Sequence, residues 1–333
     1  MKEKLCVRRG GKKALLAVFI GLCFLSVWIA VCFGAKCYHP FRVWQALFFD
    51  DGSEERLIVW NLRLPRVVAA GLVGVCLSLS GCILQGVMRN HLASPSTIGV
   101  TSGASFLGYL TLVAFPSLSF LLPIGSILGA FVTTMLIYLL AYRKGASPVK
   151  MILAGLAVSA LFGALSDTVK TLFAENVGNV SAFLVGGLNG VVWEDCLLVL
   201  PYAMAGALFC LLLPSKMNIL MLGDETASSL GLHTERFRFL LICISSLLAG
   251  ASIAVAGLVG FVGLIVPHIA RLIVGADYRF LFPASASLGF LLLVLCDTVG
   301  RVIVLPAEIP VGILLSLIGA PFFLFLLRTR EKE

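Results

Sequence analysis

The sequence contains few charged residues. Only 13% of its 333 residues are Asp, Glu, Lys or Arg, whereas 59% are hydrophobic. Soluble globular proteins average about 25% charged residues, which cover their surface. The shortage of charge therefore excludes a soluble protein of this length and indicates a chain that lies mostly within a membrane.

Motifs for nucleotide, metal and nucleophilic chemistry are also missing. The Gly10–Lys13 run has neither the spacing nor the hydroxyl residue of a phosphate-binding loop. The four histidines lie far apart, at 39, 91, 233 and 268, with no HExxH pattern. No Ser/His/Asp set is recognisable. We therefore expect no catalytic residues, no metal site and no cofactor in this chain.

The ten cysteines form no CxxC pair and mostly lie inside apolar runs, where a thiol packs as a small apolar group. The spacing of Cys32 and Cys37 permits a disulfide. Nothing in their context requires one.

Apolar runs long enough to cross a bilayer, which takes about 20 helical residues, recur along the chain. They lie at 14–35, 64–88, 93–115, 118–141, 149–173, 196–213, 238–260, 281–299 and 309–327, with a shorter one at 261–274. The first run follows a basic stretch, as in a signal peptide, but its length favours a retained span. We predict an all-α polytopic membrane protein with about ten transmembrane helices in one domain over 1–333.

Lysine and arginine are divided unevenly between the two sides of this arrangement. Cytoplasmic loops are enriched in these residues, and placing the N-terminus inside puts 18 of the 25 on the cytoplasmic side. Both termini are then cytoplasmic, as a basic stretch at 1–13 and a tail at 328–333, with an external loop at 36–62. The net charge of +8 thus belongs to loops that face anionic lipid, and no nucleic acid is expected.

A short polar segment at 222–232 separates two of the apolar runs. Gly223 and Asp224 favour a helix start, Asp224 and Glu225 suit its positive end, and Gly231 favours a left-handed end. We expect about two helical turns on the cytoplasmic side, inside a segment at 214–238. Such a helix is either a solvated connection or a contact for a soluble partner.

Arginines gather at the external side. Pro65 suits the first turn of the second span, and Arg63 and Arg66 share a helical face because they are three residues apart. They would suit carboxylates on a docking protein, or extend to lipid headgroups. Asp297 and Arg301 are four apart, which predicts an ion pair. Arg301 is alternatively a third member of the same external surface.

Polar residues interrupt the apolar pattern at two further places. Residues 89–103, which include Asn90, Ser94 and Pro95, break the chain between the second and third spans. Irregular backbone at membrane depth requires surrounding protein or a water-filled cavity, so this break either lines a route or is a turn. Asp167 and Lys170, in the fifth span, are either functional intramembrane charges or a mutually neutralising pair.

Six motifs in collinear order carry a family resemblance. They are NLRLPR at 61–66, LQGVMRNHLASP at 84–95, GVTSG at 99–103, LGDETASSLGL at 222–232, GFVGLIVPHIAR at 260–271 and EIPVG at 308–312. From about residue 60 onward, the chain resembles the permeases of iron-siderophore, haem and vitamin B12 ABC importers, the FecCD type.

The resemblance implies a set of partners. These are a second permease subunit, the same chain or a sister, two cytoplasmic ATPases that bind the ATP, an extracytoplasmic substrate-binding protein and membrane lipid. It implies that 222–232 is the coupling helix region seated on the ATPase, with Gly223, Asp224, Glu225, Ala227, Leu230, Gly231 and Leu232. It also implies that Arg63, Arg66 and Arg301 meet acidic residues of the binding protein.

The pathway or gate candidates that match the family are Asn90, Ser94, Pro95, Ser147 and Pro148. Asp167 is added to them because it is an intramembrane charge. The chain departs from the family at His91, where many relatives carry Pro. Ser147-Pro148 also replaces a Ser/Thr-rich stretch.

The sequence is thus interpreted as the permease subunit of an ATP-driven importer in the bacterial cytoplasmic membrane, with ferric siderophores as the first choice of cargo. Haem and cobalamin are the alternatives within the family. A secondary transporter driven by an ion gradient is the alternative from another class. It would need an ionisable or unwound site near the membrane midplane, whereas Asp167 and Asp297 both lie toward the outside.

Overall fold

The computed structural model describes residues 9–34, 36–49, 52–141 and 148–330, and within these ranges every regular element is a helix. Among the described residues, seven helices are long and apolar enough to span a membrane. They are α1 (Arg9–Cys32), α4 (Leu64–Val87), α6 (Leu122–Ala141), α7 (Pro148–Leu172), α9 (Trp193–Leu212), α12 (Thr234–Ala256) and α14 (Tyr278–Val302). Shorter apolar helices are α5 (Val100–Ala114), α13 (Val262–Val274) and the Val311–Phe325 part of α15 (Val311–Arg330). The prediction of an all-α, multi-span membrane protein is confirmed.

The predicted spans coincide with these helices, with one clear difference in the third. That span begins at Val100 and not near residue 93. The reason is local hydrogen bonding, since the side chains of Asn90, Ser94 and Thr97 bond to nearby backbone groups over 92–97. Such bonds compete with helix formation and favour turns.

Several short helices lie in segments that hydropathy predicts as connections, except that one of them, at 116–121, overlaps the start of the predicted span at 118–141. They are α2 (Pro40–Phe48), α3 (Glu54–Ile58), the π-helix η1 (Val59–Arg63), η2 (Pro116–Leu121), η3 (Ala174–Asn176), α8 (Val177–Val185), α10 (Pro214–Leu220) and α11 (Asp224–Ser229). Each has fewer than ten residues, too few for a hydropathy pattern to identify. Cys32 and Cys37 are free thiols.

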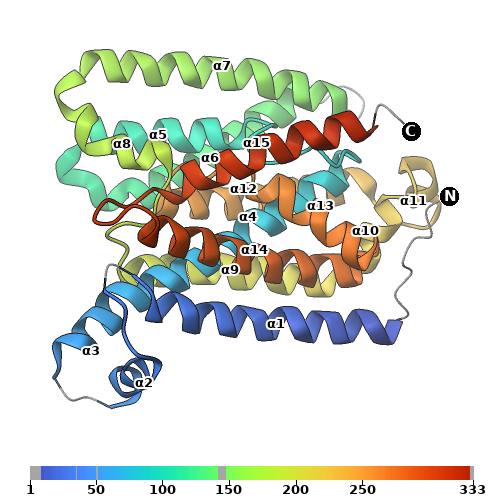
Figure 1. The fold of residues 1–333 in the computed structure, drawn as a ribbon. Helices are drawn as coiled ribbons and strands as arrows, with labels where there is room; N and C mark the ends of the chain where they lie inside the picture. The colour runs from blue at the N-terminus through green and yellow to red at the C-terminus, as the bar shows by residue number, and fades with distance from the viewer. Residues whose placement is uncertain (1–8, 35, 50–51, 142–147, 331–333) are drawn as a thin grey trace.

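Helix α4 forms the centre of the bundle, and α9, α12, α13 and α14 surround it (Figure 1). In the most apolar stretch of the helical segment that contains α4, 83% of the residues are buried. Glycine permits its closest contacts. A Cβ on Gly74 would lie 2.2 Å from the carbonyl oxygen of Gly289 in α14, and one on Gly81 would lie 1.9 Å from that of Gly263 in α13. Small residues let membrane helices pack backbone to backbone.

The chain is non-helical between α12 and α13, where Gly257 and Phe261 both have positive φ. The backbone groups there find partners at the end of α8 and in the loop that follows it. Leu258 N donates to Phe183 O at 3.0 Å, and Gly187 N donates to Ala256 O at 2.9 Å. This pairing satisfies peptide groups that lipid could not.

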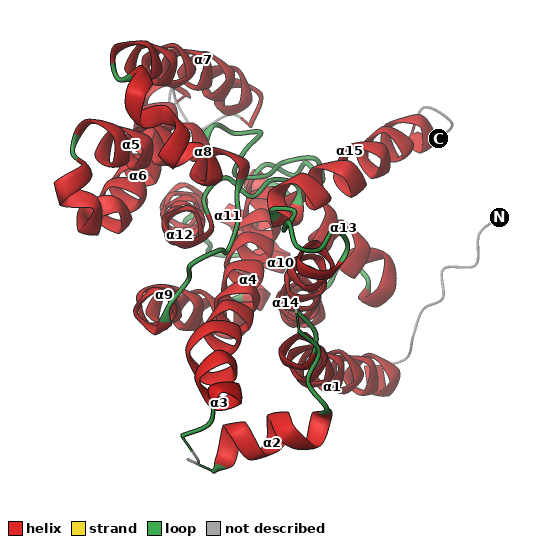
Figure 2. Ribbon diagram, turned by 60° about the vertical axis from the view of Figure 1, so that its left-hand side comes forward, coloured by secondary structure: helices red, strands yellow, loops and turns green. Residues whose placement is uncertain are grey.

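The edges of the bundle are less covered than its centre. In the most apolar stretch of α7, 17% of the residues are buried, and in that of α1, 28% are buried. Figures 1 and 2 show α7 and α1 on opposite flanks, with α2 and α3 beyond one end of α1. The predicted Ser147, the first eight residues of the basic N-terminus and residues 331–333 of the tail lie outside the described residues.

Candidate functional site

Three predicted arginines, Arg63, Arg66 and Arg301, line one pocket at the end of the bundle where α4 begins. Its volume is about 480 Å³. Glu308 and the loop at 189–192 complete the wall, together with Gly34, Ile58 and Leu62. We call this cavity the arginine pocket. It joins residues from α4, α14 and three loops, so distant parts of the sequence meet here.

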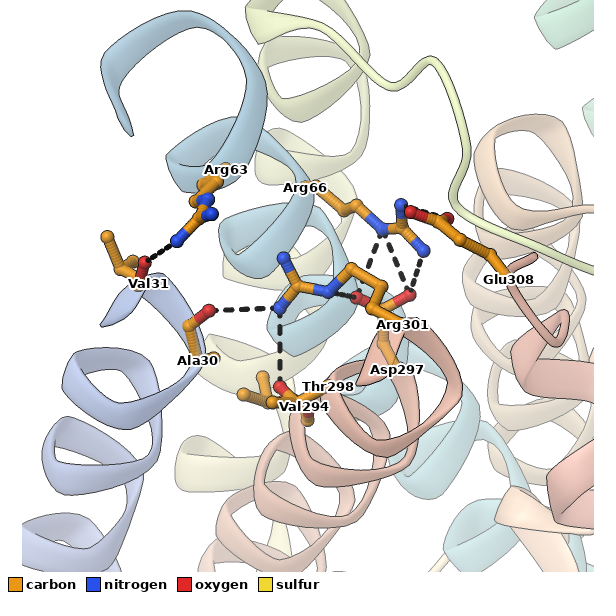
Figure 3. Close-up of polar contacts among 9 residues, drawn as sticks. All are labelled: Ala30, Val31, Arg63, Arg66, Val294, Asp297, Thr298, Arg301 and Glu308. Atoms are coloured by element: carbon orange, nitrogen blue, oxygen red, sulfur yellow. Dashed lines mark hydrogen bonds and ion pairs between the residues drawn. The ribbon is translucent and has the colours of Figure 1, made fainter. Parts of the chain in front are cut away.

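Two of these arginines cap the end of α1 (Figure 3). Arg63 Nη1 donates to Val31 O at 2.8 Å and Cys32 O at 3.2 Å, and Arg301 Nη2 donates to Ala30 O at 3.0 Å. The last carbonyls of a helix lack intrahelical donors, and its C-terminal end attracts cations. Both arginines are buried, at 7% and 4% exposure. They therefore hold α1 against α4 and α14.

The third arginine, Arg66, belongs to a network of carboxylates. It donates from Nε and Nη2 to Asp297 at 2.9–3.1 Å, and from Nη1 to Glu308 at 2.7 Å. Asp297 also forms an ion pair with Arg301, Nε to Oδ2, at 3.2 Å. The predicted pairing along one face of α14 is thus confirmed. Asp297 is 2% exposed, so its charge depends on the two guanidinium groups beside it.

The turn before α4 explains why two arginines three residues apart reach different partners. Residues 59–63 are π-helical, and Pro65 in the first turn of α4 has no amide hydrogen for a bond to the preceding turn. Such π-turns interrupt helices and re-aim side chains, often at functional sites. Arg63 accordingly lies toward α1 and Arg66 toward α14, as Figure 3 shows.

The arginine pocket thus differs from a rim of freely projecting guanidinium groups. Arg63 and Arg301 bind main-chain oxygens and Asp297 inside the fold. Of the charged side chains in the pocket, those of Arg66 and Glu308 are the more accessible from its opening, at 13% and 32% exposure. Three arginines face two carboxylates, so one positive charge is in excess. The docking of a partner here stays a prediction.

At the other end of the bundle, the predicted polar helix is present as α11. Gly223 precedes it with φ +114°, and Gly231 follows it with φ +81°. Asp224 and Glu225 form its first turn. Ala227 is fully buried, whereas Leu222 and Leu230 are 60% and 58% exposed. The segment is therefore held against the bundle by Ala227, and its two leucines project outward.

Asp224 joins α11 to two long helices. Arg238 Nη2 in α12 donates to its Oδ1 at 2.8 Å, and Arg89 Nη2, just after α4, donates to the same oxygen. Arg238 also pairs with Glu235 at 3.0 Å. Arg238 is 2% exposed. The sequence does not predict these partners, because Arg89 lies 135 positions from Asp224 and Arg238 lies 14 positions from it.

A shallow depression adjoins α11. It has a volume of about 390 Å³ and is lined by Ser228, Gly231, Leu232, His233, Thr234, Glu235 and Arg236. The predicted residues Gly231 and Leu232 thus face open space on the end of the molecule. We call residues 222–232, which include α11, together with the other residues that line this depression, the polar end surface.

Asp277, directly before α14, links α14 to α10 at this same end of the bundle. Its Oδ1 accepts a hydrogen bond from Asn218 Nδ2 in α10 at 2.7 Å and from the amide of Arg279 at 3.0 Å. Burial alone would raise the pKa of Asp277, but these hydrogen bonds and the charges of Arg279 and Lys12 outweigh burial and lower it. The carboxylate thereby caps α14.

The predicted gate residues within the described ranges belong to the turns before α5 and to α7. Asn90 and Ser94 are occupied in the turns before α5, where Ser94 and Pro95 are buried. Pro148 begins α7. Asp167 pairs with Lys170 at 2.9 Å, the contact expected of a mutually neutralising pair, and its side chain is 73% exposed on α7.

A further buried polar pair was not predicted. Arg271 Nη1 in α13 donates to Gln85 Oε1 in α4 at 3.0 Å, and Gln85 Nε2 lies 3.3 Å from Leu264 O. Gln85 is fully buried. The sequence signal for such a contact is a glutamine inside an apolar run, because a buried amide group needs hydrogen-bond partners.

Comparison with known proteins gives the family. The model of the FecCD transport family matches residues 22–329. The chain is 39% identical over 326 residues to the iron(3+)-hydroxamate import system permease protein FhuB of Bacillus subtilis (strain 168), covering 96% of this chain and 84% of that protein. It is 40% identical over 287 residues to the cobalamin import system permease protein BtuC of Halobacterium salinarum, covering 86% and 77%.

The fold agrees with these matches. A solved structure of a metal-chelate type ABC transporter in an inward-facing conformation superimposes with a TM-score of 0.85 at 31% identity, covering 95% of this chain and 99% of that chain. The resemblance predicted from the six motifs is therefore confirmed. The chain belongs to the FecCD transport family.

Proposed function

We propose that this chain is the membrane permease subunit of an ATP-driven importer of ferric siderophores. The observation that carries the proposal is the pair of polar sites at opposite ends of α4. Arg66 lies in its first turn at the arginine pocket, and Arg89 follows its last turn at the polar end surface. One buried helix thus connects two surfaces that soluble partners could reach from opposite sides of a membrane.

The polar end surface is proposed to face the cytoplasm and to bind the ATPase. Basic residues support this orientation, because Arg89, Arg236, Arg238 and Arg279 all lie at or next to that end. The exposed Leu222 and Leu230 supply apolar contact area, and Glu225 and Arg236 supply a polar rim. Hydrolysis of ATP would occur on that partner.

The arginine pocket is proposed to receive an acidic side chain of an external binding protein. Its excess positive charge favours a carboxylate, and Arg66 is the arginine with a share of its side chain exposed there. Arg63 and Arg301 would act indirectly, by holding α1 and Asp297 in place around the pocket.

The cargo is proposed to pass between two permease subunits. The centre of the single chain is filled, since α4 contacts its neighbours backbone to backbone through Gly74 and Gly81. The outer face of α7, which carries Asp167, is uncovered. The turn at 89–99 lies near the cytoplasmic end of this arrangement and is the proposed inner gate.

The cargo class rests on the relatives' names alone. A protein that imports iron(3+)-hydroxamate and a protein that imports cobalamin both belong among them. We choose the ferric chelate, and cobalamin or haem is the alternative that the following experiment separates.

The test is purification from native membranes in mild detergent after crosslinking, with mass spectrometry of co-purifying proteins and of any ligand. We expect an ATPase, a binding protein and a ferric chelate. Leu230→Asp, on the polar end surface, should remove the ATPase and leave the binding protein. Recovery of this chain without an ATPase in the unsubstituted form would refute the proposal, and bound cobalamin or haem would refute the cargo.

A further inference from the structure

Helix α2 carries an uncovered aromatic face. Phe41, Trp44 and Phe48 are 63%, 48% and 63% exposed, and their spacing of three and four residues places them on one side of the helix. Phe49, directly after the helix, is 63% exposed as well. Contiguous exposed aromatic groups on a folded protein mark a surface that something other than water covers.

The exposure belongs to a helix that is firmly held. Val43 and Ala46, on the opposite side, are buried at 0% and 2% exposure in the cluster that contains Val59. Arg56 Nη1 donates to Ala46 O at 3.0 Å and to Phe49 O at 2.8 Å, which caps the end of α2. The aromatic face is therefore fixed in its outward position.

The positions of the tryptophans indicate the depth of this aromatic face relative to the membrane. The chain has four, and all of them are at the pocket end of the bundle. Trp28 lies near the end of α1, Trp60 in η1, Trp193 at the start of α9 and Trp44 in α2. Tryptophan concentrates where a membrane meets water, because its ring is apolar and its N–H is polar.

The aromatic face continues onto the flank of α1. The rings of Trp28 and Trp44 are 6.0 Å apart, and those of Trp44 and Phe48 are 4.4 Å apart. Most residues in the apolar stretch of α1 are not covered by this chain, so lipid can reach this flank. Figures 1 and 2 both show α2 beyond α1, at the side of the bundle.

We propose that α2 is an interfacial anchor, whose Phe41–Trp44–Phe48 face lies in the headgroup region of the lipid bilayer at the pocket end. A short helix with one apolar aromatic face and one polar edge lies in the plane of that region. Arg42 and Gln45 form the polar edge, and Arg42 pairs with Glu55 at 2.6 Å. That pairing offsets the charge of Arg42, so the anchor requires no particular lipid charge.

The anchor would fix the level of the arginine pocket in the membrane. The chain between α1 and α2 passes Arg63, whose Nη2 donates to Lys36 O and whose guanidinium lies 4.7 Å from the ring of Tyr38. A force on α2 is therefore transmitted to a residue that lines the pocket. This role is independent of the cargo and of the ATPase.

The test is fluorescence quenching of the full chain in phosphatidylcholine nanodiscs. Trp28, Trp60 and Trp193 are replaced by Phe, so that Trp44 is the only emitter. We expect loss of most of its emission with lipids brominated near the headgroup end of the chain, a smaller loss with bromine near the methyl end, and little loss with aqueous iodide. Quenching by iodide alone would overturn the proposal, as would protection from all three quenchers.

A matched control places the single tryptophan at the other end. Leu230→Trp, with Trp44 also replaced by Phe, puts an exposed residue on the polar end surface, where iodide alone should quench. A second measurement leaves all tryptophans in place and introduces a photoreactive benzoylphenylalanine at Phe48. Adducts with phospholipid are expected, whereas adducts with a second copy of this chain or with another protein would overturn the proposal even if the tryptophan variants do not fold.

Discussion

Arg66 donates to both carboxylate oxygens of Asp297, a residue 231 positions further along the chain. The carboxylate is 2% exposed and also faces Arg301. Asp297→Asn should therefore leave the buried guanidinium of Arg301 without its anion and that of Arg66 with Glu308 alone, and destabilise the fold by about 3–5 kcal/mol. Thermal unfolding in detergent measures this loss.

Two comparisons sharpen that prediction. The double variant Asp297→Asn with Arg66→Gln should recover part of the stability, since fewer unpaired charges remain. Arg42→Gln removes the exposed pair with Glu55, with Arg42 64% exposed, and should cost no more than about 1 kcal/mol. Equal losses for Asp297→Asn and Arg42→Gln would contradict the role of burial.

Asp224→Asn should uncouple the two ends of the permease. Arg89 and Arg238 lose the anion that joins α11 to α4 and α12, so motion of the ATPase would reach the long helices less completely. We expect the ATPase to remain bound and uptake per ATP hydrolysed to fall by about 5- to 150-fold, the usual range of coupling energies. Proteoliposomes that contain the whole importer provide the measurement.

The neighbouring Glu225→Gln is the control for this variant. Glu225 shares the first turn of α11, and its carboxylate is not among the ion pairs found within the described ranges. If both substitutions lower coupling equally, the effect comes from the ATPase contact and not from the Asp224 links.

Close packing around α4 predicts a strong effect at Gly81. A methyl group there would lie 1.9 Å from Gly263 O, and overpacking of this kind costs about 1–3 kcal/mol or more. A methyl group on Gly163 in α7 would have no atom within 4 Å, so Gly163→Ala should be neutral or slightly stabilising. Thermal unfolding of the two alanine variants, side by side, makes the comparison, and similar midpoints would argue against tight contact of α4 with α13.

Asp277 predicts a dependence of stability on pH. Its folded pKa is lowered, so its carboxylate stabilises the fold above the unfolded value of about 3.9, and that contribution is lost as pH falls through the folded pKa. Asp277→Ala should cost about 1 kcal/mol at neutral pH, the usual value of a helix cap. The difference from the unsubstituted protein should shrink on acidification below pH ~4. A difference that stays constant with pH would exclude the ionised cap.

Hydropathy and local spacing predicted one layer of this structure well. The long helices follow from apolar runs, α11 follows from Gly223 and Gly231, and the Asp297–Arg301 pair follows from a spacing of four residues. Each of these depends on residues that are close in sequence.

The remaining contacts depend on residues that are far apart. Arg63 and Arg301 were expected at an open rim, but they bind carbonyl groups at the end of α1, which no side-chain pattern reveals. The partners Arg66 and Glu308 are 242 positions apart. The helix α2 was hidden because its nine residues mix aromatic and polar types and do not form a long apolar run.

The capping of α1 by Arg63 and Arg301 has a consequence for how the chain can vary. Both guanidinium groups bind main-chain oxygens of residues 30–32, and every residue type supplies the same oxygen. Because Ala30, Val31 and Cys32 are buried, substitutions of similar size at these positions keep the hydrogen bonds of the junction, provided that the helix still ends there. A chimaeric permease that takes its first helix from a relative could thus keep these main-chain contacts with Arg63 and Arg301.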